Sequence, residues 1–584
     1  MYTWSLKNLY LGLDDPKFKE DNARLKELIA EIKEAAPKLS IDNATKDLEA
    51  FLLLYEDLDN LVSKVAQFLN LTLATDVTNK EFNNAVVVLR KELLQTTLPL
   101  TLFEKFIAKI PDLDSVINKS EFLKEYEFFL KEIKDNSKYL LSEAEEVLAA
   151  EMNQSGGGLF SKMQGDLVST LSCDYEGKSV PFSTIRNLAY DESKDVRKKA
   201  YEIEKESLKT INQASAFAMN GIKKEVSTIA KKRGYASALE GTLKQSRINQ
   251  DVLDALLQAM NEYLPEFRKY MRRKGELLGH NNGLPFYDLF APMGSSNTKY
   301  TVEEAQEFIL KNFKTFSDDL HDLAKRAFTE DWIDYLPRKG KRGGAFCSSI
   351  YPLRESRILT NFDGNIGDIS TIAHELGHAY HNFNIYDERI LNTSYPMPIA
   401  ETASILCETI VKKAVLKDVK SDEEKLGILE QELQDSNQVI VDILSRYLFE
   451  TEVFKRSENE FLDNETLDKI MIDAQLASYG DGLDPEYLHE GMWVAKNHYY
   501  STGRSFYNFP YAFGLLFSKG IYAQYMEKGS AFVSDIKTLL SMTGKATLMD
   551  VAASINIDIT NVDFWRSSLE VIKEDIQLFL DITK

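Results

Sequence analysis

The sequence predicts a mainly α-helical protein that contains one small β-sheet. Apolar residues recur at i, i+3, i+4 and i+7 through most of the chain, which is the spacing of amphipathic helices packed on one side. One stretch, residues 339–362, combines Gly and Pro boundaries with the β-branched and aromatic composition of strands. The 584 residues correspond to several domains at roughly 150 residues each, so the chain is long enough to bury a large core.

From residue 21 to about 150, one amphipathic helix follows another. In the first of them the apolar positions are Leu25, Leu28, Ile29 and Ile32. This pattern predicts a helical bundle, and we assign residues 1–190 to an N-terminal helical lobe. The stretch 153–158, Asn-Gln-Ser-Gly-Gly-Gly, interrupts the pattern. It lacks the Gly-Lys-Ser/Thr of a phosphate-binding loop, and we therefore predict a flexible loop.

Residues 190–275 return to charged helices, and their basic run at 269–274 is expected to be a solvated helix face. Residues 280–298 gather Gly, Pro, Asn and Ser, which predicts a long loop, and another helix leads to about residue 336. Strands are expected within 339–362. After Pro398 the chain is predicted to be helical to residue 584, apart from loops near 480–485 and 503–510.

The charge and cysteine content argue against several classes of protein. Lys and Arg total 70 and Asp and Glu 91, so the net charge is −21, and such a surface repels nucleic acid and anionic membranes. Three cysteines without a CxxC pair predict reduced thiols. The N-terminus lacks the apolar stretch of a signal peptide, and the longest charge-free apolar run, 505–518, is shorter than the roughly 18 to 20 residues that span a bilayer. We expect a cytoplasmic protein with no nucleic-acid or membrane partner.

The most informative segment is 368–380, DISTIAHELGHAY, which is predicted to be a helix capped by Asp368. His374 and His378 are four residues apart, so their side chains lie about 5 to 6 Å apart on one helix face. Two imidazoles at this spacing can bind one metal ion, and zinc is the ion expected. Glu375 follows the first histidine and does not need to bind the metal, which suits a general base that takes a proton from metal-activated water.

A catalytic zinc site takes a third protein ligand and keeps one position open. The continuation that metzincins use would need glycine at 381 and histidine at 384, but the sequence has His381 and Asn384. A Pro-containing break at 395–398 is followed by a new helix, and Glu401 lies 23 positions after His378, which is enough for the chain to turn back. We therefore predict Glu401 as the third ligand. Glu388 is closer in sequence, but it lies in a charged loop that is expected to face solvent.

Three neighbours of these residues are candidates for supporting roles. Glu408 follows Glu401 by almost two helical turns, so it is predicted to accept a hydrogen bond from a ligating imidazole and to fix its tautomer. His381 follows His374 by the same interval and is expected to support a ligand, to contact substrate or to make a structural hydrogen bond. Cys407 lies among apolar neighbours and is expected to be a packing residue.

Four segments together resemble one known family: HELGHAYH at 374–381, ETASILCE at 401–408, GKRGGAF at 340–346 and HYYSTGRSFYNFPYAFG at 498–514. They are similar to the thimet-oligopeptidase-like zinc metallopeptidases, and within these to the oligoendopeptidase F branch. The likeness extends from about residue 155 to about 522 and is most specific in the metal helix. It implies a two-lobed helical metallopeptidase with a deep substrate channel and a small β-sheet next to the HExxH helix.

The resemblance also implies roles for individual residues. One zinc ion per chain would be held by His374, His378 and Glu401, with Glu375 as the base, which agrees with the reasoning from the residues alone. In the family, a histidine and tyrosines late in the chain donate hydrogen bonds to the tetrahedral intermediate. The residues that match these donors are His498, Tyr507 and Tyr511. The start of the predicted strand is expected to pair with the extended substrate through Gly344, Ala345 and Phe346.

The implied activity is cleavage of internal bonds in short unstructured peptides, carried by residues 191–584 as the catalytic zinc-peptidase region. One alternative is a zinc carboxypeptidase or dipeptidyl carboxypeptidase of related helical fold, for which Arg504 is a candidate anchor for the substrate C-terminus. The other is a non-catalytic peptide-binding scaffold with a structural metal. Three ligands beside an intact Glu375 argue against the scaffold, because structural zinc sites are normally closed by a fourth protein ligand.

Overall fold

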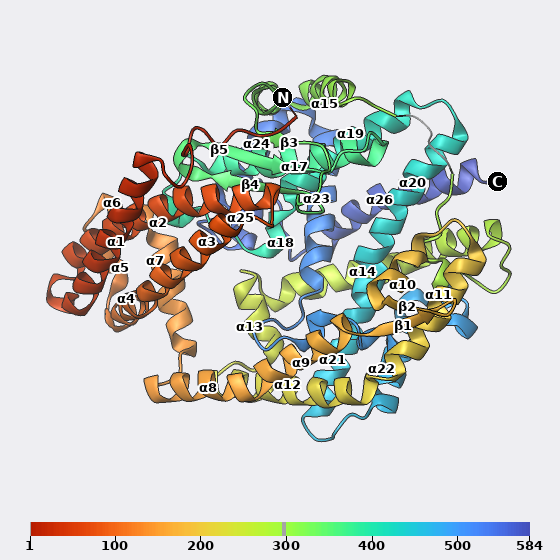
Figure 1. Cartoon of the computed structure of the whole chain (residues 1–584), viewed down its shortest axis with the longest axis horizontal. Coiled ribbons are helices and arrows are strands. Elements are labelled where there is room, and N and C mark those ends of the chain that lie inside the picture. Colours follow the sequence, from red (N-terminus) through yellow and green to blue (C-terminus); the bar gives the residue numbers. More distant parts are fainter. Residues whose placement is uncertain (1, 295–298) are drawn as a thin grey trace. The chain divides into compact units, whose positions relative to one another are not determined.

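The computed structural model describes residues 2–294 and 299–584, which are mainly α-helical and carry two small sheets. The mainly α fold class is confirmed. The chain forms two compact units that interleave along the sequence (Figure 1). Unit 1 comprises Met1–Lys138, Asn297–Val415 and Gln524–Asn556, and unit 2 comprises Tyr139–Ser296, Leu416–Ala523 and Ile557–Lys584. The predicted functional division at residue 190 stays a prediction.

Unit 1 begins with a helical bundle, drawn in red to orange in Figure 1. Its helices are α1 (Pro16–Ala35), α2 (Ala44–Thr75), α3 (Lys80–Leu93), α4 (Thr97–Lys109), α5 (Leu113–Ile117), α6 (Glu121–Glu125) and α7 (Glu127–Asn136). The four apolar positions predicted for the first helix, Leu25, Leu28, Ile29 and Ile32, are all buried. The apolar stripe therefore packs into the core of the bundle, as its spacing predicts.

A three-stranded sheet follows α15 (Val302–Phe316) and α16 (Asp318–Thr329). Its strands are β3 (Ile333–Asp334), β4 (Phe346–Ile350) and β5 (Glu355–Leu359), in the order β3-β5-β4. β4 and β5 pair antiparallel with Phe346 opposite Leu359, whereas β3 is parallel to β5. The two strands predicted within 339–362 are confirmed; β3 was not predicted.

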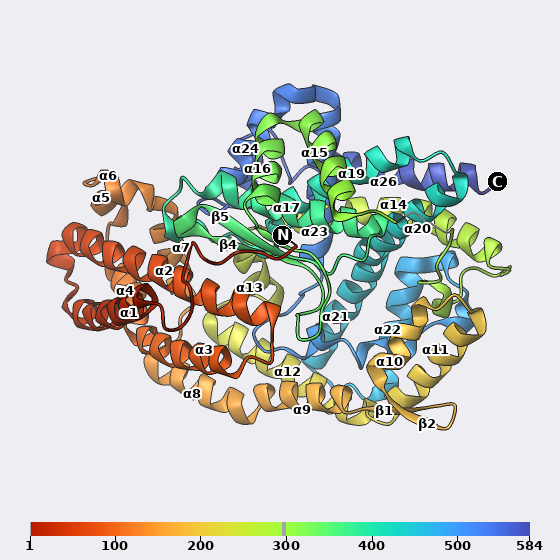
Figure 2. The same ribbon diagram turned by 45° about the horizontal axis from the view of Figure 1, so that its top comes forward.

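The sheet lies between two groups of helices of unit 1. Successive side chains of β4 face opposite sides of the sheet, so the strand contacts both groups. Ser348 donates a hydrogen bond of 2.8 Å to Gln67 of α2, whereas Ser349 bonds at 3.2 Å to Tyr386, the residue after α17 (Ile366–Ile385). Ile350 and Leu359 join the hydrophobic core of the N-terminal bundle. The sheet thus contacts α2 on one face and α17 on the other (Figure 2).

The remaining helices of unit 1 surround α17. They are α18 (Met397–Ala400), α19 (Thr402–Asp418), α24 (Val533–Met542) and α25 (Leu548–Ala553). α17 packs against α24 as well as against β4 and β5. The chain leaves unit 1 near the end of α19 and returns to it near the end of α23 (Phe509–Lys528).

Unit 2 is almost entirely helical. Its helices are α8 (Glu143–Ser155), α9 (Gly157–Ser169), α10 (Phe182–Asn187), α11 (Lys194–Lys209), α12 (Asn212–Arg233), α13 (Ala238–Gln245), α14 (Gln250–Leu277), α20 (Asp422–Asn437), α21 (Ile443–Ser457), α22 (Asn464–Tyr479), most of α23 and α26 (Val562–Ile582). A π-helical turn, Gln438–Asp442, joins α20 to α21. The hairpin of β1 (Ser172–Tyr175) and β2 (Lys178–Pro181) was not predicted.

Two local predictions in unit 2 are wrong. Residues 153–158 are not a flexible loop, because residues 153–155 end α8, residues 157–158 begin α9 and only Gly156 separates the two helices. The backbone N–H of Gly157 donates a 2.6 Å hydrogen bond to the carboxylate of Glu225, which fixes this joint. In the basic run 269–274, Lys274 is fully buried and pairs with the buried Glu430, so this part of the helix face is not solvated.

The predicted loops agree better with the structure. Residues 280–294 are irregular apart from a 3₁₀ turn at Phe286–Asp288, while residues 295–298 of the predicted loop lie outside the described residues. Short 3₁₀ turns occupy Gly480–Gly482 and Pro485–Tyr487, and residues 501–508 are irregular up to the start of α23.

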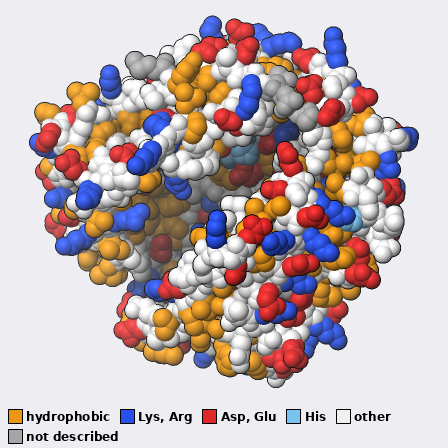
Figure 3. Space-filling model, turned by 45° about the vertical axis from the view of Figure 1, so that its right-hand side comes forward, with side chains coloured by type: hydrophobic (Ala, Val, Ile, Leu, Met, Phe, Trp, Pro, Cys, Tyr) orange, Lys and Arg blue, Asp and Glu red, His pale blue; other side chains and the backbone are white. Residues whose placement is uncertain are grey.

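The surface carries charges of both signs. On the face drawn in Figure 3, Lys and Arg side chains are interspersed with Asp and Glu side chains. Within the described ranges, no helix combines the length and the apolarity that a membrane span requires.

Candidate metal centre

The N-cap of the helix that carries the HELGH motif lies three residues before the predicted cap. Asn365 is the N-cap of α17; its side chain accepts a hydrogen bond from the N–H of Asp368, and the carboxylate of Asp368 accepts one from the N–H of Asn365. The prediction that Asp368 is the cap is wrong, because Asp368 is the third helical residue of this capping box. Ile369, Ile372 and Leu376 are buried, so the apolar face fixes the helix against the unit core.

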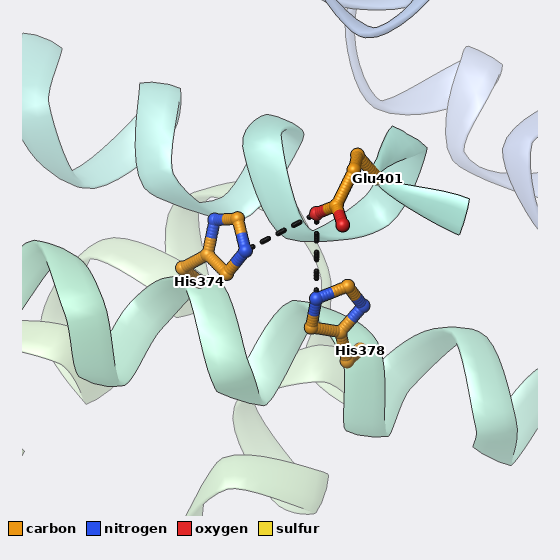
Figure 4. Close-up of side chains that lie close together, drawn as sticks. All are labelled: His374, His378 and Glu401. Carbon is orange, nitrogen blue, oxygen red and sulfur yellow. Dashed lines mark ion pairs between the residues drawn. The ribbon is translucent and has the colours of Figure 1, made fainter. Parts of the chain in front are cut away.

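The structure brings His374, His378 and Glu401 together, as predicted. Their ligand atoms all lie within 4.8 Å of one another. Figure 4 shows both imidazoles on one face of α17, directed at the same carboxylate oxygen of Glu401. That Oε2 is 3.2 Å from Nε2 of His374 and 3.4 Å from Nε2 of His378.

Gly377 allows α17 and α19 to approach each other closely. An added Cβ on Gly377 would come within 2.5 Å of the backbone oxygen of Ala403 and of Cα of Ser404. The backbones of α17 and α19 therefore meet at this position, and a side chain would push them apart. Glu401 stands at the joint between α18 and α19, opposite the two histidines.

Other side chains hold two of the three candidate ligands, His374 and Glu401, in place. Nδ1 of His374 lies 3.0 Å from Oε2 of Glu408, as predicted, and Oε1 of Glu408 pairs with Lys412 at 2.7 Å. The hydroxyl of Ser404 donates a 2.8 Å hydrogen bond to Oε2 of Glu401. Because these contacts restrict the ring of His374 and the carboxylate of Glu401, the site is preorganised.

The charges of the site interact strongly. Burial lowers the pKa of His374, but hydrogen bonds and charges from Glu401 and Glu408 outweigh burial and raise this pKa to about 10. Burial raises the pKa of Glu401, but the hydrogen bond from His374 and the charge of His378 outweigh it and lower this pKa to about 2. Burial lowers the pKa of His378 to about 4. The carboxylates thus stabilise a positive charge at this site.

Glu375 lies in the same helix but outside this ligand group. Its side chain is buried, and burial raises its pKa to about 7. The backbone N–H of Cys347, in strand β4, hydrogen-bonds to its carboxylate. Oε2 has no hydrogen-bond partner among the described residues. One oxygen is therefore fixed by the edge of the sheet, and the other remains available to accept a proton.

The structure also places His381, for which the sequence allowed several roles, and Glu388, which was expected to face solvent. His381 is fully buried; its ring stacks on Tyr395 with centroids 4.2 Å apart, and Nε2 is 2.9 Å from the hydroxyl of Thr543. This placement favours the structural role among those considered. Glu388 pairs with Lys545 and is partly buried, so the expectation that it faces solvent is wrong.

The predicted late residues form a second cluster, within unit 2. The rings of His498 and Tyr507 have centroids 5.4 Å apart, and Tyr507 and Tyr511 lie 5.6 Å apart. Burial lowers the pKa of His498, and the cations Arg446, Lys496 and Arg504 lower this pKa further. Nδ1 of His498 is buried without a hydrogen-bond partner among the described residues.

A buried polar network fixes the turn that carries Tyr507. Lys223 and Glu450 are both fully buried and pair at 2.7 Å, and Asn508 donates a 3.1 Å hydrogen bond to the other oxygen of Glu450. Phe506 adopts φ of 52°, a conformation that is strained for a residue with a bulky side chain. The network and the packing of Phe506 on Phe454 at 5.3 Å together hold this turn.

The predicted substrate-pairing segment lies at the start of β4, an edge strand of the sheet. The side chain of Phe346 packs into the N-terminal core, 6.2 Å from the ring of Trp4. The carbonyl of Gly344 already accepts a 2.8 Å hydrogen bond from Asn361. A peptide strand at this edge would therefore use other main-chain groups of residues 344–346.

Sequence reasoning missed three of the supporting groups. Ser404 is three residues after Glu401, and Lys412 is four residues after Glu408, so helical spacing could have indicated both. The N–H of Cys347 could not have been found, because every residue of a strand has the same backbone group.

Comparisons with known proteins find relatives along most of the chain. The model of "Peptidase family M3" matches residues 187–571, and the model of "Oligopeptidase F" matches residues 109–172. Oligopeptidase PepF of Bacillus subtilis is 26% identical over 475 residues, which cover 80% of this chain and 70% of the relative. Group B oligopeptidase PepB of Streptococcus agalactiae is 24% identical over 545 residues, 92% of this chain and 87% of the relative.

Solved structures share the fold over nearly the whole chain. A protein of Chlamydophila abortus superposes with a TM-score of 0.87 at 22% identity, covering 100% of this chain and 98% of that one. Oligoendopeptidase-F from Enterococcus faecium gives a TM-score of 0.71 at 17% identity, covering 97% and 98% of the two chains.

Proposed function

The chain belongs to peptidase family M3, whose model matches residues 187–571, and from this premise we propose that it is a zinc-dependent endopeptidase of short unstructured peptides. The oligoendopeptidase F resemblance is confirmed by the family models and the relatives. The observation that carries the proposal is the convergence of His374, His378 and Glu401 beside the unpartnered oxygen of Glu375.

The three candidate ligands fit a zinc ion. Two atoms that each lie about 2 Å from one tetrahedral ion are roughly 3.3 Å apart. The distances from Oε2 of Glu401 to Nε2 of His374 and of His378, 3.2 and 3.4 Å, match this separation. Two imidazole nitrogens and one carboxylate oxygen are also the donor set of catalytic zinc sites, which leave one position open. When bound, the ion would act as a Lewis acid that polarises the scissile carbonyl and lowers the pKa of water.

In the proposed mechanism, Glu375 moves the proton. Its free Oε2 accepts a proton from the attacking water and then delivers that proton to the nitrogen of the leaving amine. The hydrogen bond from the N–H of Cys347 keeps the carboxylate in one orientation during both transfers. The carboxylate of Glu408 holds the ring of His374, so the ligand set keeps its geometry while the proton moves.

The cluster in unit 2 is proposed to stabilise the developing oxyanion. His498 and Tyr507 would donate hydrogen bonds to it, with Tyr511 as a further donor. Of these donors, Tyr507 lies on the turn that Asn508 ties to the buried pair of Lys223 and Glu450, so its backbone is fixed within unit 2 before substrate arrives. Fixed donors stabilise developing charge without a reorganisation cost.

We expect Tyr507→Phe to lower kcat by about 10²-fold, because removing one fixed donor to an oxyanion typically has this effect. Zinc content should stay at the wild-type level, since Tyr507 is not among the candidate ligands. Stopped-flow hydrolysis of a quenched fluorescent peptide and elemental analysis would measure both quantities. Tyr499→Phe, a buried ring in the same segment, serves as the matched control. Unchanged kinetics in Tyr507→Phe would move the donor role to Tyr511.

The proposed substrate is held in extended form at residues 344–346. Main-chain hydrogen bonds to a strand edge recognise the peptide backbone and leave its side chains largely unread, which suits an enzyme of broad specificity. A deep channel that excludes folded proteins is part of the same proposal and rests on the family resemblance.

The proposal is tested first by digestion of unstructured peptides, with and without a chelator. We expect internal cuts that disappear on chelation and return when zinc is added, as read from fragment masses. Removal of residues from the C-terminus alone would favour the carboxypeptidase, with Arg504 as its anchor. Absence of any metal-dependent cleavage would leave the binding scaffold as the surviving alternative.

A further inference from the structure

Unit 2 contains a partly open cavity that the proposed peptidase chemistry does not use. Its volume is about 360 Å³, within the usual range of small-molecule sites. Residues of α10 and α11, two helices labelled in Figure 1, line it, and the π-helical turn Gln438–Asp442 contributes two further lining residues. Single π-helical turns inside helices occur frequently at functional sites.

The cations around this cavity are paired with acids, with one exception. The pairs are Arg186 with Glu204, Arg197 with Asp288 and Arg446 with Asp442. Lys496 also lines the cavity, but within the described part of the chain its ammonium makes no ion pair. Burial, together with the charge of Arg446, lowers the pKa of Lys496 to about 8. The charges of Asp442 and Glu204 act in the opposite direction and raise this pKa, but neither carboxylate forms an ion pair with the ammonium. A largely buried ammonium without a close ion-pair partner is costly, so an anion beside it would be stabilised.

A histidine on the cavity wall faces the carboxylate of Glu204 but lacks a hydrogen-bond partner among the residues that the structure describes. His489 is 2% exposed, and neither ring nitrogen makes a hydrogen bond with a described residue. Its Nε2 is 3.7 Å from the carboxylate of Glu204, which is too far for a hydrogen bond. The backbone of His489 is fixed by two hydrogen bonds with Gln475, of 3.0 and 2.8 Å. The ring is thus held in place with polar atoms still to be satisfied.

The rest of the wall is aromatic. The ring of His489 lies edge-on to Phe286 at 5.2 Å and to Tyr201 at 5.8 Å. Tyr190 and Phe290, whose rings lie 4.9 Å apart, also line the cavity, and Tyr190 is 58% exposed. A ligand here would therefore place an apolar or aromatic group against these rings.

We propose that this cavity binds a small organic carboxylate with an aromatic or apolar body. The carboxylate pairs with Lys496 and accepts a hydrogen bond from His489, and the body of the ligand packs against Phe286, Phe290 and Tyr190. Binding at this site does not depend on the peptidase function, because none of these residues belongs to the proposed catalytic or ligand set.

The proposal is tested by calorimetric titration of the full-length protein with 3-phenylpropionate. We expect saturable binding of one molecule per chain. The amide of the same acid should bind at least about tenfold more weakly, because hydrogen bonds in which one partner is ionised are stronger than those between neutral groups. Acetate should also bind more weakly, since it does not reach the aromatic wall. Equal affinity for the acid and the amide, or for the acid and acetate, would overturn the proposal.

Variants locate the binding. Lys496→Met should weaken 3-phenylpropionate binding at least about tenfold and should leave thermal stability equal or higher, because it removes an unpaired charge. Lys199→Met, an exposed lysine of α11, should bind as the wild type does. Glu401→Ala should also bind normally, which separates this cavity from the metal centre. Binding that survives in Lys496→Met and is lost in Glu401→Ala would contradict the assignment.

A second variant at the mouth of the cavity protects the test against a folding defect. Tyr190→Ala changes a largely exposed ring and is expected to fold normally. It should weaken the binding of 3-phenylpropionate several-fold and that of acetate little. If 3-phenylpropionate does not bind the wild type saturably, or binds Tyr190→Ala and the wild type equally, the cavity is not the site.

Discussion

Glu375→Gln is expected to lower kcat by about 10²- to 10⁴-fold, the usual contribution of a positioned general base. Glutamine has nearly the same shape as glutamate, but its amide does not accept and return a proton at neutral pH. The hydrogen bond from the N–H of Cys347 can still be accepted by the amide oxygen, so we expect the fold and the metal site to remain. Hydrolysis rates and zinc content, measured on the same preparation, check this expectation.

Asp387→Asn is the matched control for this experiment. Asp387 is an exposed acid soon after the same helix, where it pairs with Arg354, so its loss should leave kcat unchanged. Hydrolysis by Glu375→Gln at the wild-type rate would remove Glu375 from the role of base. A parallel loss of zinc would instead show that Glu375 acts through metal binding.

Glu401→Ala is expected to lose most of its zinc, and with it nearly all activity. The substitution removes the oxygen that lies within 3.4 Å of both histidine nitrogens. It should lower metal affinity by more than the roughly 10- to 100-fold that follows the loss of a residue supporting a ligand. Competition with a chromophoric chelator measures this affinity directly, without any assay of peptide cleavage.

Glu408→Gln is the matched comparison, because it removes a residue that supports a ligand and leaves the three candidate ligands in place. Glu408 bonds to His374 but is not in the ligand group, so its replacement should weaken zinc binding by about 10- to 100-fold. Full zinc retention in Glu401→Ala would show that another residue is the third ligand. Equal losses in the two variants would mean that support and ligation contribute alike.

Much of the fold could be predicted because helical periodicity is a strong signal in long segments. The first bundle follows from stripes such as Leu25, Leu28 and Ile32, which are buried as expected. The hairpin of Ser172–Tyr175 and Lys178–Pro181 escaped because its strands are only four residues long and mostly exposed, so they lack a clear apolar alternation. The sequence does not separate Asp368 from the true cap, because both Asn365 and Asp368 are residue types that cap helices and only the geometry of the capping box distinguishes them.

The candidate ligands could be predicted because their chemistry fixes both residue type and spacing. His374 and His378 lie one helical turn apart, and the break before Glu401 indicated a second helix that returns to them. The distance between those two helices could not be predicted, because it depends on backbone contacts. The cavity near Lys496 could not be predicted either, since its lining comes from segments far apart in the sequence.

The close approach at Gly377 has a consequence for how the motif is recognised. The pattern His-Glu-x-x-His allows any residue at its fourth position. Here that position is Gly377, and the backbone of Ala403 and Ser404 leaves no space for a side chain. A chain with a larger residue at this position would need its third ligand on a helix set further away, or on a longer side chain. The size of the residue at this position therefore indicates, from sequence alone, how closely the helix after the third ligand can approach the helix that carries the two histidines.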